Sequence, residues 1–210
     1  MTPVGRRSVA IFDLGGVLIE WNPRHLYRKL FAGDERAMEA FLATVCTKEW
    51  NERQDAGRTF AEGTRELLPQ HADKLGLIEA WCRRFDEMIP GAIEGSVAVL
   101  GELKRRGVPV YGISNWSAET FPPQRERFDF LSWFDDLVIS GVVGVIKPDP
   151  RIFRILLERN GIDPASAVFV DDVAANAEAA SALGLHGIHF RSPDQLRREL
   201  AVVGLLPAST

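Results

Sequence analysis

The sequence predicts an α/β protein with a doubly wound parallel sheet and a helical segment inserted near its beginning. After residue 90, short apolar runs rich in β-branched residues alternate with helical patterns, which is typical of such a sheet. An earlier apolar run ends before Asp13, whereas residues 20–90 are rich in Glu, Arg, Ala and Leu at helical spacing. We therefore expect a core domain of residues 1–20 and 91–210 and a helical domain of residues 21–90.

Five strands are expected to form the sheet, each at a short apolar run. Three helical patterns between them stop at Gly107, Gly161 or Gly184, and glycine is common just after a helix. The Pro122-Pro123 pair should block a long regular helix, because proline lacks the amide hydrogen that a helix interior needs. The predicted strands are residues 8–12, 108–113, 137–140, 167–170 and 187–190, and the predicted helices are residues 96–106, 149–160 and 174–183.

The inserted segment carries its own signals for helix starts and for a core. Asp34 is a candidate N-cap, and Thr59 with Glu62 three residues later matches a capping box. The aromatic residues of this segment are interpreted as the core of a small helical bundle rather than as a cofactor pocket. These aromatic residues are Trp50, Phe60, Trp81 and Phe85.

Composition limits the class of function. The 210 residues are 46% hydrophobic and 26% charged with a net charge of -4, which argues against a broad nucleic-acid surface because phosphate binding needs concentrated positive charge. Cys46 and Cys82, the only cysteines, form no Cys-x-x-Cys pair, so neither a disulfide framework nor a cysteine zinc site is expected. No stretch is long enough to span a membrane, and Asp13 ends the first apolar run too early for a signal peptide. We expect a cytoplasmic monomer or homodimer with no nucleic-acid or membrane partner.

Polar side chains occur in four short stretches, and three of these follow an apolar run, at the edge of the sheet where ligands bind in open parallel sheets. A carboxylate, a hydroxyl, an ammonium and a carboxylate pair would meet there. This combination suits attack by an aspartate on an anionic group beside a divalent cation. The residues are Asp13 with Gly15 and Gly16, Ser114 with Asn115, Lys147, and Asp171 with Asp172.

Each of these residue types has a role in such chemistry. Asp13 can act as a nucleophile that forms a covalent intermediate, and the glycines behind it let the backbone approach a metal or a phosphoryl group. Three carboxylates in one place would repel one another and raise their pKa values. A bound Mg²⁺ resolves that repulsion, because it favours oxygen ligands.

The remaining polar groups suit a phosphoryl ligand. The Ser114 hydroxyl and nearby backbone N–H groups can hold phosphoryl oxygens. The charge of Lys147 would offset the carboxylates and stabilise a phosphoryl group during its transfer. Asn176, four residues after Asp172, would lie on the same side and could position one carboxylate.

The ordered set of motifs resembles the haloacid dehalogenase-like (HAD) hydrolase superfamily, in the group with a helical cap inserted after the first motif. The resemblance extends over essentially the whole chain, and bacterial sugar-phosphate phosphatases, such as those acting on α-D-glucose 1-phosphate, look most similar. The motifs that carry it are Phe-Asp-Leu-Gly-Gly-Val at 12–17, Ser114-Asn115, Lys147-Pro148, and Val170-Asp171-Asp172 with Asn176.

The resemblance implies a Rossmann-like core and a cap that shields the site and selects the substrate. It implies that Asp13 forms an aspartyl-phosphate, that Ser114 and Lys147 bind the phosphoryl group, and that Asn115 belongs to the same catalytic motif. It also implies a Mg²⁺ held by Asp13, the carbonyl of Gly15 and Asp172, with Asp171 close by through water. The substrate would be a small phosphorylated molecule.

One position departs from the family pattern. Most phosphatases of this superfamily carry a second Asp, as general acid and base, where this chain has Gly15. General acid catalysis contributes about 10²–10⁴-fold. Three explanations stay open: a substrate with a good leaving group, a replacement acid among Glu20, His25 and Asp55, or a slow enzyme or binding protein.

Three functions are therefore weighed. The first is a Mg²⁺-dependent phosphatase of small phosphorylated metabolites, which the acidic pair favours. The second is a metal-independent 2-haloacid dehalogenase, in which clustered acids would lack a countercation. The third is a catalytically weak protein that binds a phosphorylated ligand. Trp116 is a candidate for lining the pocket or for core packing, and cap residues proposed to contact substrate are Trp21, Arg24, Trp50 and Arg53.

Overall fold

The centre of the molecule is a five-stranded parallel sheet in the order β3-β2-β1-β4-β5. The computed structural model describes residues 7–208. The chain runs outward from β1 to β2 and β3, and then crosses back to β4 and β5 on the other side of β1. The carboxyl end of β1 is therefore the point where the winding reverses, which is where such sheets bind ligands. The strands are β1 (Val9–Phe12), β2 (Val110–Ser114), β3 (Asp136–Ile139), β4 (Ala167–Asp171) and β5 (His186–His189).

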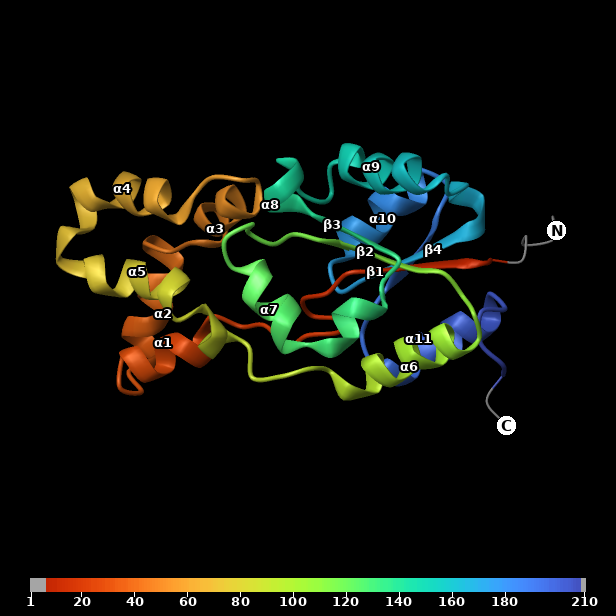
Figure 1. Cartoon of the computed structure of the whole chain (residues 1–210). Helices are drawn as coiled ribbons and strands as arrows, with labels where there is room; N and C mark the ends of the chain where they lie inside the picture. The colour runs from red at the N-terminus through yellow and green to blue at the C-terminus, as the bar shows by residue number, and fades with distance from the viewer. Residues whose placement is uncertain (1–6, 209–210) are drawn as a thin grey trace.

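Helices cover both faces of this sheet (Figure 1). On one face, α6 (Glu94–Arg105) packs against α11 (Pro193–Val202), and on the other α9 (Pro150–Asn160) packs against α10 (Ala174–Ala182). Alternate strand residues point to opposite faces, so the core has two apolar layers. Ile11 belongs to the layer under α9, and Phe12 belongs to the opposite layer. The predicted doubly wound α/β fold is confirmed.

Between β1 and α6 the described chain is helical. The helices lie beyond the carboxyl ends of the strands, on the left in Figure 1. Their place agrees with a cap over the sheet edge, and the division into two domains at residues 20 and 91 stays a prediction. The elements are α1 (Arg24–Leu30), α2 (Glu35–Thr44), α3 (Lys48–Asp55), α4 (Phe60–His71), η1 (Ala72–Lys74), α5 (Leu75–Arg83) and η2 (Phe85–Met88).

The expected caps and aromatic core of this helical segment are present. The Ala37 N–H donates to Asp34 Oδ1 at 3.0 Å, and Thr59 and Glu62 form the reciprocal capping box at the start of α4. The Trp81 ring is buried, 5.6 Å from that of Trp50. The aromatic residues thus form the apolar core of the helical segment.

The segment after β2 has no long regular helix, as expected from Pro122-Pro123, but it is not irregular. It contains α7 (Phe121–Arg127), whose prolines occupy the first turn, where the missing N–H is not needed. The short helices η3 (Asp129–Trp133), α8 (Ser140–Val143) and η4 (Pro164–Ser166), like α3 and α11, were not assigned from the sequence. Cys46 and Cys82 are free thiols. No helix among residues 7–208 has the length and apolar character needed to cross a membrane.

Candidate active site

Asp13 comes directly after β1, at the point where the winding of the sheet reverses. Its side chain is buried, with Oδ2 at 2.9 Å from Lys147 Nζ. Its Oδ1 accepts the N–H of Leu14 at 2.7 Å. The carboxylate is therefore held in place by the Lys147 ammonium at one oxygen and by the Leu14 N–H at the other.

Lys147 links the carboxyl ends of three strands. Its Nζ donates to Asp171 Oδ2 at 2.7 Å and to the carbonyl of Ile113 at 2.9 Å, besides its contact with Asp13. Burial acts to lower the pKa of Lys147, but the carboxylates of Asp13 and Asp171 outweigh it and hold the pKa above its usual value. The lysine is thus a fixed positive charge between two aspartates.

Asn115 fixes the backbone of Lys147. Its Oδ1 accepts the Lys147 N–H at 2.8 Å, and its Nδ2 donates to the Lys147 carbonyl at 3.0 Å. The structure therefore places Asn115 against the main chain of Lys147. Ser114, the last residue of β2, is buried and directly precedes Asn115.

Asp171 and Asp172 complete the acidic cluster. Asp171 is fully buried at the end of β4, where Oδ1 accepts the N–H of Val173 at 2.8 Å and the Nδ2 of Asn176 at 3.0 Å. Carboxylate oxygens of Asp13, Asp171 and Asp172 lie within 4.8 Å of one another. The three acids that the sequence proposed as metal ligands are thus brought together.

The electrostatics of this cluster favour a bound cation. Burial raises the pKa of Asp13 to about 7; Asp171 and Asp172 add to this rise, and Lys147 opposes it. Burial and Asp171 also raise the pKa of Asp172. Burial and mutual repulsion make it costly for these carboxylates to be charged together. A hard divalent cation such as Mg²⁺, which prefers oxygen ligands, would offset that cost.

The two glycines behind Asp13 differ in what surrounds them. Gly16 has a φ of +73°, and a Cβ built on it would lie 2.2 Å from Asp172 Oδ2. Any larger residue would displace Asp172 and strain the backbone. A Cβ on Gly15 would meet nothing within 4 Å, so the position that lacks the expected second Asp faces open space.

The other predicted contact residues are engaged elsewhere. Trp116 is buried with its ring 5.9 Å from that of Phe85, which is the core-packing alternative considered from the sequence. Trp21 packs 6.4 Å from Trp81 within the helical segment. Arg24 donates to Glu39 at 2.8 Å and Arg53 to Glu66 at 2.6 Å. Substrate contact by Trp21, Arg24, Trp50, Arg53 or Trp116 stays a prediction.

Sequence reasoning missed one residue beside the cluster. His189, the last residue of β5, pairs in register with Asp171, and its Nε2 lies 3.0 Å from the carbonyl of Asp172. The signal was the strand register, which places the end of β5 beside the end of β4. With Asn176, His189 supports the acidic loop from the side opposite Lys147.

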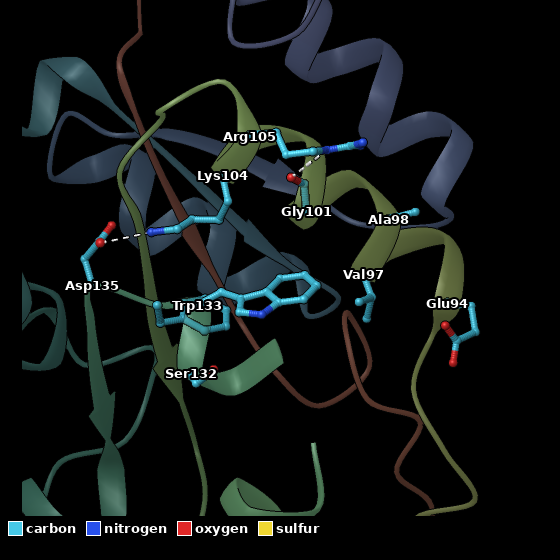
Figure 2. Close-up of a pocket in the computed structure, with 10 residues that line it drawn as sticks. Glu94, Val97, Ala98, Gly101, Lys104, Arg105, Ser132, Trp133 and Asp135 are labelled. Atoms are coloured by element: carbon cyan, nitrogen blue, oxygen red, sulfur yellow. Dashed lines mark hydrogen bonds and ion pairs between the residues drawn. The ribbon is translucent and has the colours of Figure 1, made fainter. Parts of the chain in front are cut away.

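A surface groove of about 670 Å³ lies apart from this cluster (Figure 2). It runs between α6 and η3, with Trp133 along it and an ion pair of 3.0 Å between Lys104 and Asp135. None of its lining residues belongs to the acidic cluster.

Comparison with known proteins defines the class. The family model of haloacid dehalogenase-like hydrolases matches residues 8–184. The sesquiterpene phosphatase astK of Aspergillus oryzae is 30% identical over 186 residues, which are 87% of this chain and 89% of that protein. The chain therefore belongs to the haloacid dehalogenase-like hydrolases, and it is an enzyme of that class.

Solved structures show the same fold. A HAD family enzyme from Bacteroides thetaiotaomicron, in complex with magnesium and inorganic phosphate, superposes with a TM-score of 0.67 at 22% identity, covering 89% of this chain and 95% of that one. A dehalogenase superposes with a TM-score of 0.60 at 20% identity, covering 86% and 83%. At these identities the likeness concerns the fold, and the reaction must be argued from the site.

Proposed function

We propose that this hydrolase is a Mg²⁺-dependent phosphatase of small phosphorylated metabolites, sugar phosphates among them, and that it acts through an aspartyl-phosphate on Asp13. The observation that carries the proposal is the acidic cluster itself: a buried nucleophile between a fixed lysine and two further carboxylates. A substrate of this site has to bring negative charge to a cation, which phosphate esters do.

Mg²⁺ fits the oxygen donors present. Asp13, the carbonyl of Gly15 and Asp172 would hold it, with Asp171 close by. When bound, the ion neutralises phosphate charge and orients the phosphoryl group. Gly16 supports this assignment, because its missing side chain is what allows Asp172 to come close.

The chain's own residues then perform the transfer. A carboxylate oxygen of Asp13 attacks phosphorus, the bond from phosphorus to the ester oxygen breaks, and the alcohol leaves after taking up a proton. Lys147 keeps its positive charge beside the attacking carboxylate and offsets the charge on the phosphoryl oxygens. Ser114 donates its hydroxyl to one of these oxygens. Water then attacks the phosphoryl group and frees Asp13.

The leaving alcohol needs a proton, and the residues around Asp13 determine which group can supply it. Gly15 supplies none, and the three Lys147 contacts leave that ammonium no free hydrogen. His25 is paired with Glu20 at 3.1 Å on the exposed surface. We therefore favour substrates whose leaving group needs little protonation, such as an anomeric hydroxyl or an acyl group.

The 2-haloacid dehalogenase is the second candidate. In that reaction the same aspartate attacks a carbon atom and no metal takes part. Lys147 would then be the countercharge for the three carboxylates of Asp13, Asp171 and Asp172. The charge balance, and the phosphatase named among the relatives, support phosphate chemistry instead. For the protein as a whole we propose a cytoplasmic monomer or homodimer with a small phosphorylated substrate and no nucleic-acid or membrane partner.

The test is hydrolysis of p-nitrophenyl phosphate and a panel of sugar phosphates, with Mg²⁺ and with EDTA, by the wild type and Asp13→Asn. We expect metal-dependent turnover that Asp13→Asn abolishes. Failure to release phosphate from any panel member would refute the proposal. Turnover of 2-haloacids that EDTA does not affect would establish the dehalogenase.

A further inference from the structure

The segment from the last residue of α3 to the first residue of α4, here called loop 55–60, contacts the loop that follows Ser114 and Asn115. The hydroxyl of Ser140 donates to the carbonyl of Asp55 at 2.5 Å and accepts the N–H of Trp116 at 2.9 Å. The N–H of Ser117 faces the carboxylate of Asp55 and acts to lower the pKa of that carboxylate. Both Trp116 and Ser117 directly follow Ser114 and Asn115.

Two further contacts hold the same loop. Glu119 accepts the N–H of Phe60 at 2.6 Å. Gly57, with a φ of +102°, brings its backbone so close to α8 that an added Cβ would lie 3.4 Å from the carbonyl of Gly141. Figure 1 shows the ends of α3 and α8 side by side, and these two helices are in contact.

We propose that Asp55 is a positioning residue, which ties loop 55–60 to residues 116–117 and thereby holds Ser114 and Asn115 in place for the phosphoryl group. The proposal rests on the proposed phosphatase function for its catalytic consequence. The path is short: Asp55 holds Ser117, the backbone leads to Asn115, and Asn115 clamps Lys147 against Asp13.

The tie depends on the charge of Asp55. Its carboxylate faces two donors, the Ser117 N–H and the Asn51 Nδ2, and the Asn51 Nδ2 donates to it at 2.8 Å. A protonated carboxyl keeps acceptor capacity on its oxygens, but it accepts hydrogen bonds more weakly than the charged carboxylate does. The neutral form is therefore a weaker tie than the anion.

The charges around Asp55 bring its titration near neutral pH. Burial and the carboxylate of Glu52, one turn earlier on α3, raise the pKa of Asp55 from 3.8 to about 7, and the Ser117 N–H opposes the rise. Glu52 is paired with Lys48. From the core side, Glu119 is engaged with Phe60, and α8 carries no charged residue. The tie should strengthen as pH rises through about 7.

The first experiment compares hydrogen exchange of residues 115–120 in the wild type, Asp55→Asn and Glu49→Gln at one pH. Asn presents an amide to two donors, so we expect faster exchange in this peptide, with the strand amides of β2 unchanged. Glu49→Gln removes one exposed charge from the same helix and should leave exchange as in the wild type. Unchanged exchange in Asp55→Asn would overturn the proposal, whether or not the chain is a phosphatase.

The second experiment measures kcat and KM for p-nitrophenyl phosphate between pH 5.5 and 9 in the same variants and in Glu52→Gln. The assays use saturating Mg²⁺, which keeps Asp13, whose pKa in the metal-free protein is also about 7, ionised over this pH range. Under these conditions Asp55→Asn should lower kcat/KM about ten- to a hundredfold, the size expected for a misplaced reacting group, and should remove the acidic inflection near 7. Glu52→Gln should shift this inflection to lower pH, because it removes a charge that raises the pKa.

These outcomes separate the two proposals. An inactive wild type refutes the phosphatase, and the exchange result still decides whether Asp55 holds residues 116–117. Faster exchange with kcat/KM and the pH profile unaltered would overturn the positioning role. A uniform loss of activity with the inflection retained would also overturn it, because a purely structural defect does not remove a titration.

Discussion

Single residues decide the chemistry of this site, and the sequence predicts most of them. Asp13, Lys147, Asp171 and Asp172 are predicted to meet because most of their motifs follow apolar runs that end at one edge of the sheet, and the structure brings their polar atoms together. The clamp by Asn115 and the support by His189 depend on side-chain geometry between separate strands. Residue type and spacing do not contain that information.

Gly16 should be intolerant of a side chain. In Gly16→Ala the new methyl group would overlap the carboxylate of Asp172, so we expect about a tenfold or greater loss of Mg²⁺ affinity, as for groups that orient metal ligands. The measurement is the Mg²⁺ dependence of the melting temperature. Gly15→Ala is the matched control, because its Cβ meets open space; equal effects of the two variants would contradict this account.

Gly15 should accept an aspartate. Gly15→Asp adds a carboxylic acid next to the nucleophile, and we expect it to speed hydrolysis of esters with poor leaving groups by about ten- to a hundredfold. Esters with good leaving groups should change little. The measurement is the slope of log kcat/KM against leaving-group pKa, which should flatten. An unaltered slope would mean that another group already supplies the proton.

The raised pKa of Asp13 gives the metal-free protein a pH-dependent stability. The folded-state pKa of about 7 lies above the ordinary value of 3.8, so the folded state binds the extra proton between these values. This group's stabilising contribution is complete below pH 3.8 and is lost as pH rises through about 7. Stabilisation by Mg²⁺ should therefore be larger at pH 8 than at pH 5, as measured by melting temperatures with Mg²⁺ and with EDTA. A larger Mg²⁺ effect at pH 5 would contradict this.

At the scale of elements, the sequence predicts those strands and helices whose bounds depend on residues that are neighbours in the chain. The strands and the helices that end at Gly107 and Gly161 come within two or three residues of the predicted bounds, because buried parallel strands read as apolar runs. The Pro122-Pro123 pair excludes a long helix but not the short α7, because prolines in a first turn are compatible with a helix. Short helices such as α8 are held by tertiary contacts, which no local pattern reveals.

The capping box of α4 should contribute measurable stability. Thr59→Ala removes the acceptor of the Glu62 N–H, and loss of such a cap costs about 1 kcal/mol. Urea unfolding should show a lower midpoint with an unchanged slope. Thr64→Ala, inside the same helix, is the control and should stay within about 0.5 kcal/mol of the wild type. A neutral Thr59→Ala would show that α4 is held by packing alone.

At the scale of the whole molecule, the fold brings a helical segment over the edge of the sheet where the ends of β1, β2 and β4 and the loop of Lys147 deliver the reactive groups. The sequence predicts this arrangement because one long helical stretch interrupts the βα alternation immediately after Asp13. It does not predict which side chains of the segment face the site. Arg24 and Arg53 were proposed to contact substrate, and the structure pairs them with Glu39 and Glu66.

The central claim is that a phosphoryl group passes through Asp13. The most direct test is acid quenching of the wild type during turnover of its best substrate, followed by mass spectrometry of the peptides. The account predicts a phosphorylated peptide containing Asp13 that is missing from Asp13→Asn. Steady turnover with the phosphoryl group on another residue, or on none at any quench time, would contradict it.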